Sequence, residues 1–333
     1  MNAREPKPEW DDVPAVLRTR IAALIGEPIA SGEVAWGGYG PTASFVLTAA
    51  SGAKHFCKGT HPDNTPEGHQ AVLNECTNLQ RFPELARFGA AFRGQVEGEG
   101  WHLAVLAAVT RAQAVPPWTA DTQARAIAFI AAFHAATPAR AEEVLKDMRV
   151  SDLLGQARNW HSLQDPASRD NFAALFTDER AVQAWLDAHL GDLILRTGDV
   201  ASCGGPRGWI HADIRSDNLI FAEGGRLVLV DWPVLSYGPQ LLDIAFFLPS
   251  LEGEGGARCA DGLRLYELAA GVRFGAEDIA LAAATVAGFF ASRAGEPQIA
   301  ALPRLRGVQK LQLFPALAWM CDALGIAALP TPA

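Results

Sequence analysis

The spacing of apolar residues changes along the chain, and the changes predict where strands give way to helices. The segment DDVPAVLRTRIAALIG has the pattern of an amphipathic helix that ends at Gly26. Short apolar runs separated by turns continue to about Gly59 and predict β-strands. Apolar residues then recur at a helical spacing, at Val72, Leu73, Cys76 and Leu79.

The segment FGAAFRGQVEGEGWHLAVLAAV returns to a strand pattern and predicts a hairpin with its turn at Gly98-Glu99-Gly100. From Thr119 the pattern is mainly helical. TADTQARAIAFIAAFHAATP predicts an alanine-rich helix that stops at a proline. Further helices are expected at about 142–162 and 179–196, and the segment 239–324 should be mostly helical.

The composition is that of an ordinary globular protein, with 49% hydrophobic and 20% charged residues among 333. Since no run of lysine or arginine is present, nucleic-acid binding is not expected. The formal net charge of −9 would suit a cationic substrate. Glu252 and Glu254, in an expected flexible connection at 251–257, could contact such a substrate or simply be solvated.

Nothing in the sequence predicts secretion or membrane insertion. The N-terminus MNAREPKPEWDD lacks the apolar core of a signal peptide. The longest apolar stretch, IALAAATVAGFFA from Ile279, is short for a membrane span and predicts a buried helix. The five cysteines form no C-x-x-C pair, and their odd number favours reduced thiols. We therefore expect a cytoplasmic protein that does not bind membranes.

The candidate chemistry is concentrated in HADIRSDN, which begins at His211, and in LVLV, which ends just before Asp231. Asp213 is a candidate base for a hydroxyl proton. Asn218 and Asp231 offer the hard oxygen ligands that Mg²⁺ prefers. The turn at 223–226 separates two apolar runs and predicts a hairpin, after which Asp231 would follow a buried strand. Each of these residues alone could be a turn former.

Three segments, HADIRSDN, VLVDWP and GPQLLDIAFF, resemble the aminoglycoside phosphotransferase and choline kinase-like family. The family usually has Gly at the position of Ala212. The resemblance implies an α+β, two-lobed protein-kinase-like fold, with a small N-terminal lobe built on an antiparallel sheet and a larger, mostly helical C-terminal lobe. It also implies transfer of the γ-phosphoryl group of ATP or GTP to a hydroxyl of a small acceptor, which could be cationic, with Mg²⁺ held by Asn218 and Asp231.

The resemblance assigns roles to the residues around the candidate base. Asp213 would accept the hydroxyl proton, and His211 would orient the loop through hydrogen bonds. Arg215 would contact the transferred phosphate or form a salt bridge with a neighbouring carboxylate. Asp243, in the third segment, would brace the catalytic loop without a chemical role.

The N-terminal half contains weaker motifs that match the family in order. Gly37, Gly38 and Gly40 lie between two predicted strands, where a turn could bring backbone N–H groups close to phosphates or could be a plain hairpin turn. Lys58 matches the lysine that reaches the α- and β-phosphates. Glu75 would be the helix carboxylate that pairs with it.

The resemblance also suggests a division of the chain. A flexible tail at 1–9 would precede a nucleotide-binding lobe at 10–108 and a catalytic and acceptor-binding lobe at 109–333. Backbone groups near Leu106 and Val109 would meet the adenine.

Two other functions stay open at this point. One is a nucleotide-binding module of the same fold without phosphotransfer, and the other is a protein kinase, although no Ala-Pro-Glu segment follows Asp231. The expected partners are a nucleoside triphosphate and a small-molecule hydroxyl acceptor. The sequence leaves open the acceptor's identity, the choice of ATP or GTP and the oligomeric state.

Overall fold

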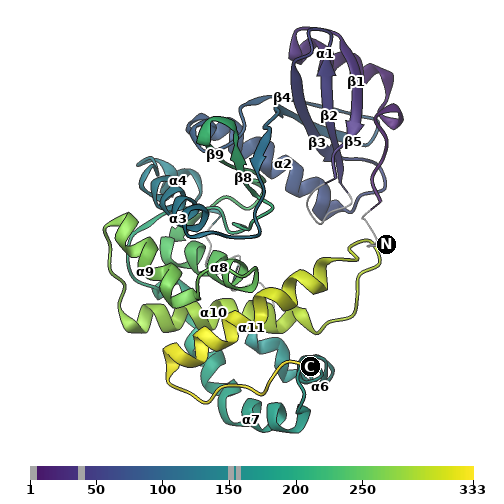
Figure 1. Ribbon diagram of the computed structural model, residues 1–333. Coiled ribbons are helices and arrows are strands. Elements are labelled where there is room, and N and C mark those ends of the chain that lie inside the picture. Colours follow the sequence, from purple (N-terminus) through teal and green to yellow (C-terminus); the bar gives the residue numbers. More distant parts are fainter. Residues whose placement is uncertain (1–5, 37–41, 149–153, 155–158) are drawn as a thin grey trace. The chain divides into compact units, whose positions relative to one another are not determined.

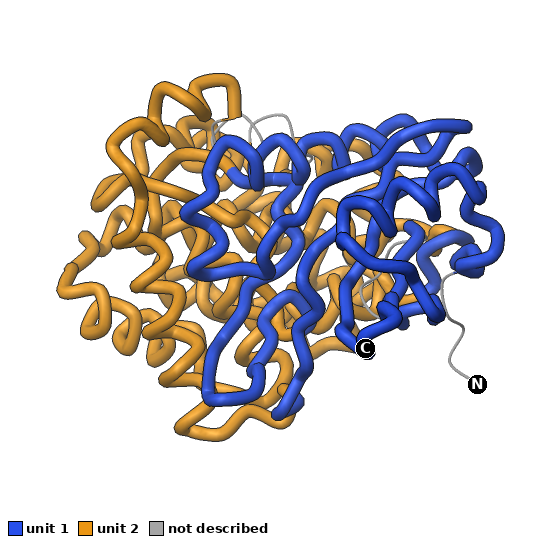
Figure 2. The backbone as a smooth tube through the Cα atoms, turned by 90° about the horizontal axis from the view of Figure 1, so that it is seen from above, with its two compact units in different colours: residues 1–114, 217–235, 300–303 blue, residues 115–216, 236–299, 304–333 orange. Residues whose placement is uncertain are grey.

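The computed structural model describes residues 6–36, 42–148, 154 and 159–333, and the chain divides into two compact units (Figures 1 and 2). Unit 1 comprises Met1–Ala114, Asp217–Leu235 and Ala300–Pro303, and unit 2 comprises Val115–Ser216, Ser236–Ile299 and Arg304–Ala333. The units are therefore interleaved along the chain, whereas the lobes expected from the sequence are contiguous. The functional boundary at 108/109 stays a prediction.

Unit 1 is built on a five-stranded antiparallel sheet with the strand order β1-β2-β3-β5-β4. Its strands are β1 (Ile29–Val34), β2 (Ala43–Ala49), β3 (Lys54–Thr60), β4 (Phe92–Gly98) and β5 (Trp101–Ala107). The predicted hairpin turn at Gly98-Glu99-Gly100 joins β4 to β5 and is confirmed. All three of its residues have positive φ angles, which Gly98 and Gly100 adopt without strain.

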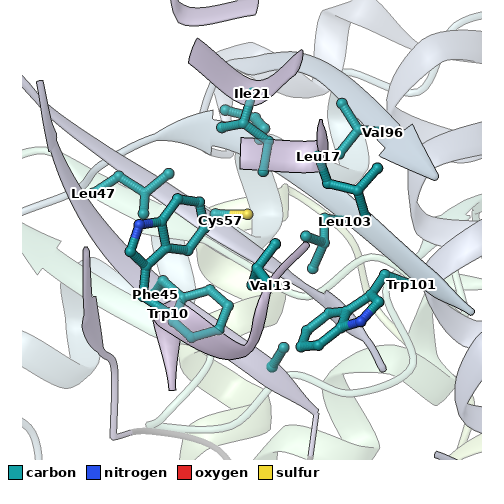
Figure 3. Close-up of a cluster of buried hydrophobic side chains, with 12 residues drawn as sticks. Trp10, Val13, Leu17, Ile21, Phe45, Leu47, Cys57, Val96, Trp101 and Leu103 are labelled. Atoms are coloured by element: carbon teal, nitrogen blue, oxygen red, sulfur yellow. The ribbon is translucent and has the colours of Figure 1, made fainter. Parts of the chain in front are cut away.

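One face of this sheet is covered by α1 (Ala15–Ile25), which ends at Gly26 as predicted, in a left-handed conformation. Leu17 and Ile21 of this helix join a buried cluster with strand residues (Figure 3). The other members labelled there are Trp10, Val13, Phe45, Leu47, Cys57, Val96, Trp101 and Leu103. Because side chains alternate across a strand, Cys57 lies in this cluster while its neighbour Lys58 faces the opposite side.

The opposite side of β3 carries the helix α2 (Pro66–Arg81). Thr65 caps its first turn by accepting a hydrogen bond from the backbone N–H of Gly68 at 3.2 Å, and Pro66 occupies the first helical position. These residues fix where the helix begins and so which side chains face the sheet. Glu75, in the middle of the helix, lies on the buried side, with its side chain only 3% exposed.

A second, three-stranded sheet in unit 1 has the order β6-β8-β9. Its strands are β6 (Arg111–Gln113), β8 (Leu219–Ala222) and β9 (Leu227–Leu229). The hairpin predicted around the turn at 223–226 is confirmed by the β8–β9 pairing. The backbone N–H of Leu229 also donates to the carbonyl of Phe88 at 2.8 Å, which ties the hairpin to the rest of unit 1.

Unit 2 is mostly helical, and the predicted helical region at 239–324 is confirmed. Its helices of at least eight residues are α3 (Ala120–Ala135), α6 (Pro166–Ala173), α7 (Glu179–Arg196), α8 (Gln240–Gly253), α9 (Cys259–Ala270), α10 (Ala276–Ala294) and α11 (Leu305–Leu324). A two-stranded sheet pairs β7 (Arg207–Ile210) with β10 (Ser236–Pro239). α10 contains the long apolar stretch and is largely buried, as predicted. None of the helices within the described residues has the length and apolarity needed to cross a bilayer.

The helix expected at 142–162 is wrong for the described part of that range. α4 (Ala141–Val144) is a single turn, and a 3₁₀ helix (Trp160–Gln164) begins later. Asn159 has an extended backbone, and its side chain accepts from the N–H of His161, so it starts a new element instead of continuing one. Residues 149–153 and 155–158 lie outside the described part.

The flexibility of the tail expected at 1–9 stays a prediction, although Lys7 Nζ donates to the carbonyl of Ala35 at 3.3 Å and to Ser44 Oγ at 2.5 Å. One other expectation needs correction. The expected flexible connection at 251–257 begins inside α8, and Leu251 is fully buried.

Candidate active site

Three charged side chains of unit 1 meet around Lys58 on β3. Its Nζ lies 2.8 Å from Oε2 of Glu75 and 2.7 Å from Oδ1 of Asp231. The ion pair predicted between Lys58 and Glu75 is therefore present, and it includes the carboxylate that follows β9. Lys58 is 18% exposed, Glu75 3% and Asp231 42%, so the cluster is buried on the helix side and open on the Asp231 side.

Burial and charge act in opposite directions on this cluster. Burial disfavours the ammonium of Lys58, but the carboxylates of Asp231 and Glu75 outweigh it and raise its pKa above the ordinary value. Burial also raises the pKa of Glu75, against the opposing effect of Lys58. The lysine is therefore a fixed positive charge at neutral pH.

α2 also holds the backbone that follows Asp231. The N–H of Trp232 donates to Oε1 of Glu75 at 3.2 Å, and Nδ2 of Asn78 donates to the carbonyl of Trp232 at 2.9 Å. Asp231 itself has a φ of +74°, which costs on the order of 1–3 kcal/mol for a residue other than glycine. Because both backbone groups of Trp232 are fixed, the strained conformation persists and aims the Asp231 carboxylate at Lys58.

Asn218 and Asp231 lie at the same end of the β8–β9 hairpin. Leu219 pairs with Leu229, and the N–H of Val230 donates to the carbonyl of Asn218 at 3.0 Å. An amide oxygen and a partly exposed carboxylate are hard donors, so this pair fits Mg²⁺, which takes few protein ligands and keeps phosphate or water oxygens. Among the described residues no group of three or more His, Cys, Asp and Glu side chains could hold a metal ion.

The candidate catalytic loop follows β7 in unit 2. Asp243, in the first turn of α8, accepts the backbone N–H groups of His211 and Ala212, each at 2.8 Å. Ala212 has a φ of +63°, where the family usually has glycine. The two hydrogen bonds to a fully buried carboxylate hold that strained residue, so Asp243 braces the loop as expected.

Within the loop, the predicted residues contact one another. The backbone N–H of Asp213 donates to Nδ1 of His211 at 3.3 Å, which agrees with an orienting role for the histidine. The guanidinium of Arg215 forms an ion pair with the carboxylate of Asp213. The salt bridge that the sequence left open for Arg215 is therefore present.

A buried network behind the loop was only partly predicted. His134 of α3 was expected to be a packed histidine, and it is, with a side chain 1% exposed. Its Nε2 lies 3.0 Å from Oδ2 of Asp243, and its Nδ1 lies 2.7 Å from the hydroxyl of Tyr266 on α9. Tyr266 gave no signal in the sequence, because the contact joins residues 132 positions apart.

Sequence reasoning also missed the contacts of Glu254, the residue that follows α8. Its Oε1 accepts from the hydroxyl of Ser216 at 2.6 Å, and its Oε2 accepts from Nε1 of Trp118 at 2.8 Å. Glu252 accepts the backbone N–H of Cys259 at 2.7 Å. Of the two alternatives that the sequence left open, substrate contact or simple solvation, the second is wrong, because both carboxylates accept protein hydrogen bonds.

The remaining candidate residues are those that the sequence assigned to nucleotide binding, and that role stays a prediction. Leu106 lies in β5, buried and paired with Phe56 of β3, and Val109 follows the strand. The three glycines Gly37, Gly38 and Gly40 lie outside the described residues.

A family model described as the phosphotransferase enzyme family matches residues 34–285, well over half of the chain. The chain belongs to this family. No curated protein matches the sequence of this phosphotransferase.

Several solved structures are similar to this phosphotransferase along most of its length. An aminoglycoside phosphotransferase from Alicyclobacillus acidocaldarius has 17% identity and a TM-score of 0.56, covering 89% of this chain and 92% of its own. A spectinomycin phosphotransferase in complex with ADP and spectinomycin has 10% identity and a TM-score of 0.56, with coverages of 90% and 98%. A choline kinase from Streptococcus pneumoniae has 17% identity and a TM-score of 0.50, with coverages of 92% and 98%. At these identities the similarity shows the fold, which is the predicted α+β protein-kinase-like fold.

Proposed function

We propose that this phosphotransferase transfers the γ-phosphoryl group of a nucleoside triphosphate, ATP or GTP, to a hydroxyl group of a small molecule. The observation that carries the proposal is the position of Lys58, bound at once to Glu75 and Asp231. In kinases the pairing of a strand lysine with a helix glutamate and the placement of a metal-binding aspartate are both required for activity. Here one partly buried cation holds both carboxylates.

The reaction forms one bond and breaks one. The acceptor oxygen bonds to the γ-phosphorus, the bond from that phosphorus to the β–γ bridging oxygen breaks, and the nucleoside diphosphate leaves. Asp213 orients the acceptor hydroxyl and takes its proton. His211 holds the backbone N–H of Asp213, and the ion pair with Arg215 holds its carboxylate.

The nucleotide is held by groups of unit 1. The ammonium of Lys58 neutralises charge on the α- and β-phosphates, and backbone groups near Leu106 and Val109 contact the base. Asn218 and Asp231 would hold Mg²⁺, which neutralises phosphate charge when bound. The sequence pattern also favours contact between the phosphates and backbone N–H groups of Gly37, Gly38 and Gly40.

The acceptor is a small hydroxylated molecule in this proposal. The similar solved structures are named for action on aminoglycosides, spectinomycin and choline, which all carry hydroxyl and cationic groups. A formal net charge of −9 agrees with a cationic acceptor. Both oxygens of Glu254 accept protein hydrogen bonds, so we do not assign cation binding to that carboxylate.

The test is nucleotide consumption in the presence of Mg²⁺ with a panel of acceptors: aminoglycosides, macrolides, amino alcohols and sugars. Asp213→Ala should lower kcat about 10²- to 10⁴-fold, the usual contribution of a positioned base, and should leave the Kd for nucleotide unchanged. Asp192→Ala is the matched control, since Asp192 is an exposed carboxylate on α7.

Turnover that one acceptor stimulates, and that Asp213→Ala abolishes while the Asp192 variant keeps it, would support the proposal and identify the acceptor. Equal turnover in Asp213→Ala and the unsubstituted protein would exclude Asp213 as the base. Nucleotide binding with no consumption in the presence of any acceptor would favour the nucleotide-binding module.

A further inference from the structure

The candidate catalytic loop is held at both of its ends by carboxylates of one helical segment. Asp243, in the first turn of α8, accepts the N–H groups of His211 and Ala212. Glu254, which caps the other end of α8, accepts the hydroxyl of Ser216. At a rise of 1.5 Å per residue, these two carboxylates are separated by roughly 16 Å along the axis, so they hold different ends of the loop.

The contact at the Ser216 end has the geometry of a strong hydrogen bond. The Oγ–Oε1 distance is 2.6 Å, typical of a hydroxyl donating to an ionised carboxylate. Ser216 is 6% exposed, so little water competes for the bond. Ser216 is also the last residue of its segment in unit 2, before the chain enters unit 1 at Asp217.

A second donor fixes the carboxylate itself. Nε1 of Trp118 donates to Oε2 of Glu254 at 2.8 Å, and the indole is 8% exposed. The ring packs edge-on against Phe247 of α8, with ring centroids 6.0 Å apart. Glu254 therefore has a fixed orientation and can act as a rigid anchor for the hydroxyl of Ser216.

We propose that Glu254 is a positioning residue for phosphoryl transfer: with Trp118 it fixes the Ser216 end of the loop and so holds Asp213 and Arg215 in their working geometry. This inference rests on the function proposed above. A displacement of about 1 Å at a reacting group can cost up to 10²-fold in rate, so a loose loop end should lower kcat. Nucleotide binding uses unit 1 residues and should be unaffected.

The test compares Glu254→Ala with Glu252→Ala. Glu252 lies two residues earlier, and its carboxylate caps the start of α9 by accepting the N–H of Cys259, so its loss should affect stability but not the loop. The probe is MgATP. ADP release is measured without an added acceptor, when water is the only acceptor, and with each member of the acceptor panel. Glu254→Ala should lower kcat about 10- to 100-fold with the KM for MgATP within about twofold.

Three further variants separate positioning from a structural role. Ser216→Ala removes only the bond to the loop and should reproduce most of the kcat loss. Combined with Glu254→Ala it should add little more, because both substitutions break the same contact. Glu254→Gln keeps an acceptor oxygen for Ser216 and should recover part of kcat.

Hydrogen–deuterium exchange gives a readout that does not depend on turnover. The peptide containing 211–218 should exchange faster in Glu254→Ala than in the Glu252 variant, at matched thermal stability. Equal exchange and equal kcat in the two variants would overturn the positioning role. Unchanged nucleotide consumption in Asp213→Ala would instead overturn the proposed function, and the exchange measurement would still decide whether Glu254 orders the loop.

Discussion

Replacing Lys58 by Met tests the charge cluster most directly, because the side chains have similar length and only the cation is lost. The substitution leaves the Glu75 carboxylate buried, with its side chain only 3% exposed. The ammonium is lost, and the N–H of Trp232 remains as a hydrogen-bond donor to the carboxylate. Removing one partner of a buried ion pair costs about 3–5 kcal/mol. Since the Lys58 side chain is 18% exposed and Trp232 still donates, we expect the lower end, about 3 kcal/mol.

The loss should depend on pH in a defined direction. Burial raises the pKa of Glu75, and Lys58 opposes that effect, so removing Lys58 raises the carboxyl's folded-state pKa further above its unfolded value. A carboxyl with a raised folded-state pKa does not destabilise the fold below its unfolded-state pKa. The penalty grows as pH rises from the unfolded-state pKa through the folded-state pKa, where the folded carboxyl also loses its proton. The free-energy difference between Lys58→Met and the unsubstituted protein should therefore be smaller at about pH 5 than at about pH 8.

The assay is urea denaturation followed by tryptophan fluorescence at both pH values. Lys54→Met is the matched control, since Lys54 is exposed at the start of the same strand and its loss should change the free energy of unfolding by less than about 0.5 kcal/mol. The double variant Lys58→Met/Glu75→Gln removes both charges and should regain much of the lost stability, but not nucleotide turnover. The reasoning fails if Lys58→Met costs less than about 1 kcal/mol at both pH values, or if the double variant is no more stable than the single one.

Three other substitutions or treatments have defined outcomes. Asp231→Asn should weaken the Mg²⁺-dependent affinity for ADP about 10-fold in titration calorimetry, while the affinity for ADP without Mg²⁺ stays the same. If the variant and the unsubstituted protein bind ADP equally well in the presence of Mg²⁺, Asp231 is not part of the metal site. Asp243→Asn should lower the free energy of unfolding by about 2 kcal/mol in urea, because it weakens the charge-assisted bonds to two loop N–H groups, and an unchanged value would contradict the bracing role. Burial raises the pKa of all five cysteine thiols, which are Cys57, Cys76, Cys203, Cys259 and Cys321. Ellman's reagent should therefore label essentially none of them in the native protein and all five in denaturant. Rapid labelling of the native protein would contradict this prediction.

The sequence predicted those parts of the structure that depend on local patterns. The end of α1 at Gly26 and the hairpin around 223–226 follow from glycine turns between apolar runs. The pairing of Lys58 with Glu75 could be predicted because strand and helix follow each other closely. Lys58 was preferred to Lys54 because Lys54 sits beside the turn at Ser51-Gly52.

Contacts between distant segments could not be predicted in this way. Glu254 lies in a glycine-rich stretch that resembles a solvated loop, and only the fold brings Ser216 and Trp118 to its carboxylate. The helix expected at 142–162 failed for a related reason. Its apolar spacing was compatible with a helix, but Trp160 is fully buried and its indole donates to the carbonyl of Ala284 in α10, a partner that local periodicity does not contain.

The interleaving of the two units has a consequence for synthesis on the ribosome. The five strands of the main sheet and α2 are complete once Ala114 has been made, but the hairpin and Asp231 belong to Asp217–Leu235. At about 5–20 residues per second, the intervening 115–216 segment takes roughly 5–20 s to emerge. During that interval Glu75 and Asn78 lack the backbone groups of Trp232, and Lys58 lacks its second carboxylate. The Lys58 cluster of unit 1 is therefore finished late, by a segment that a truncated N-terminal fragment would not contain.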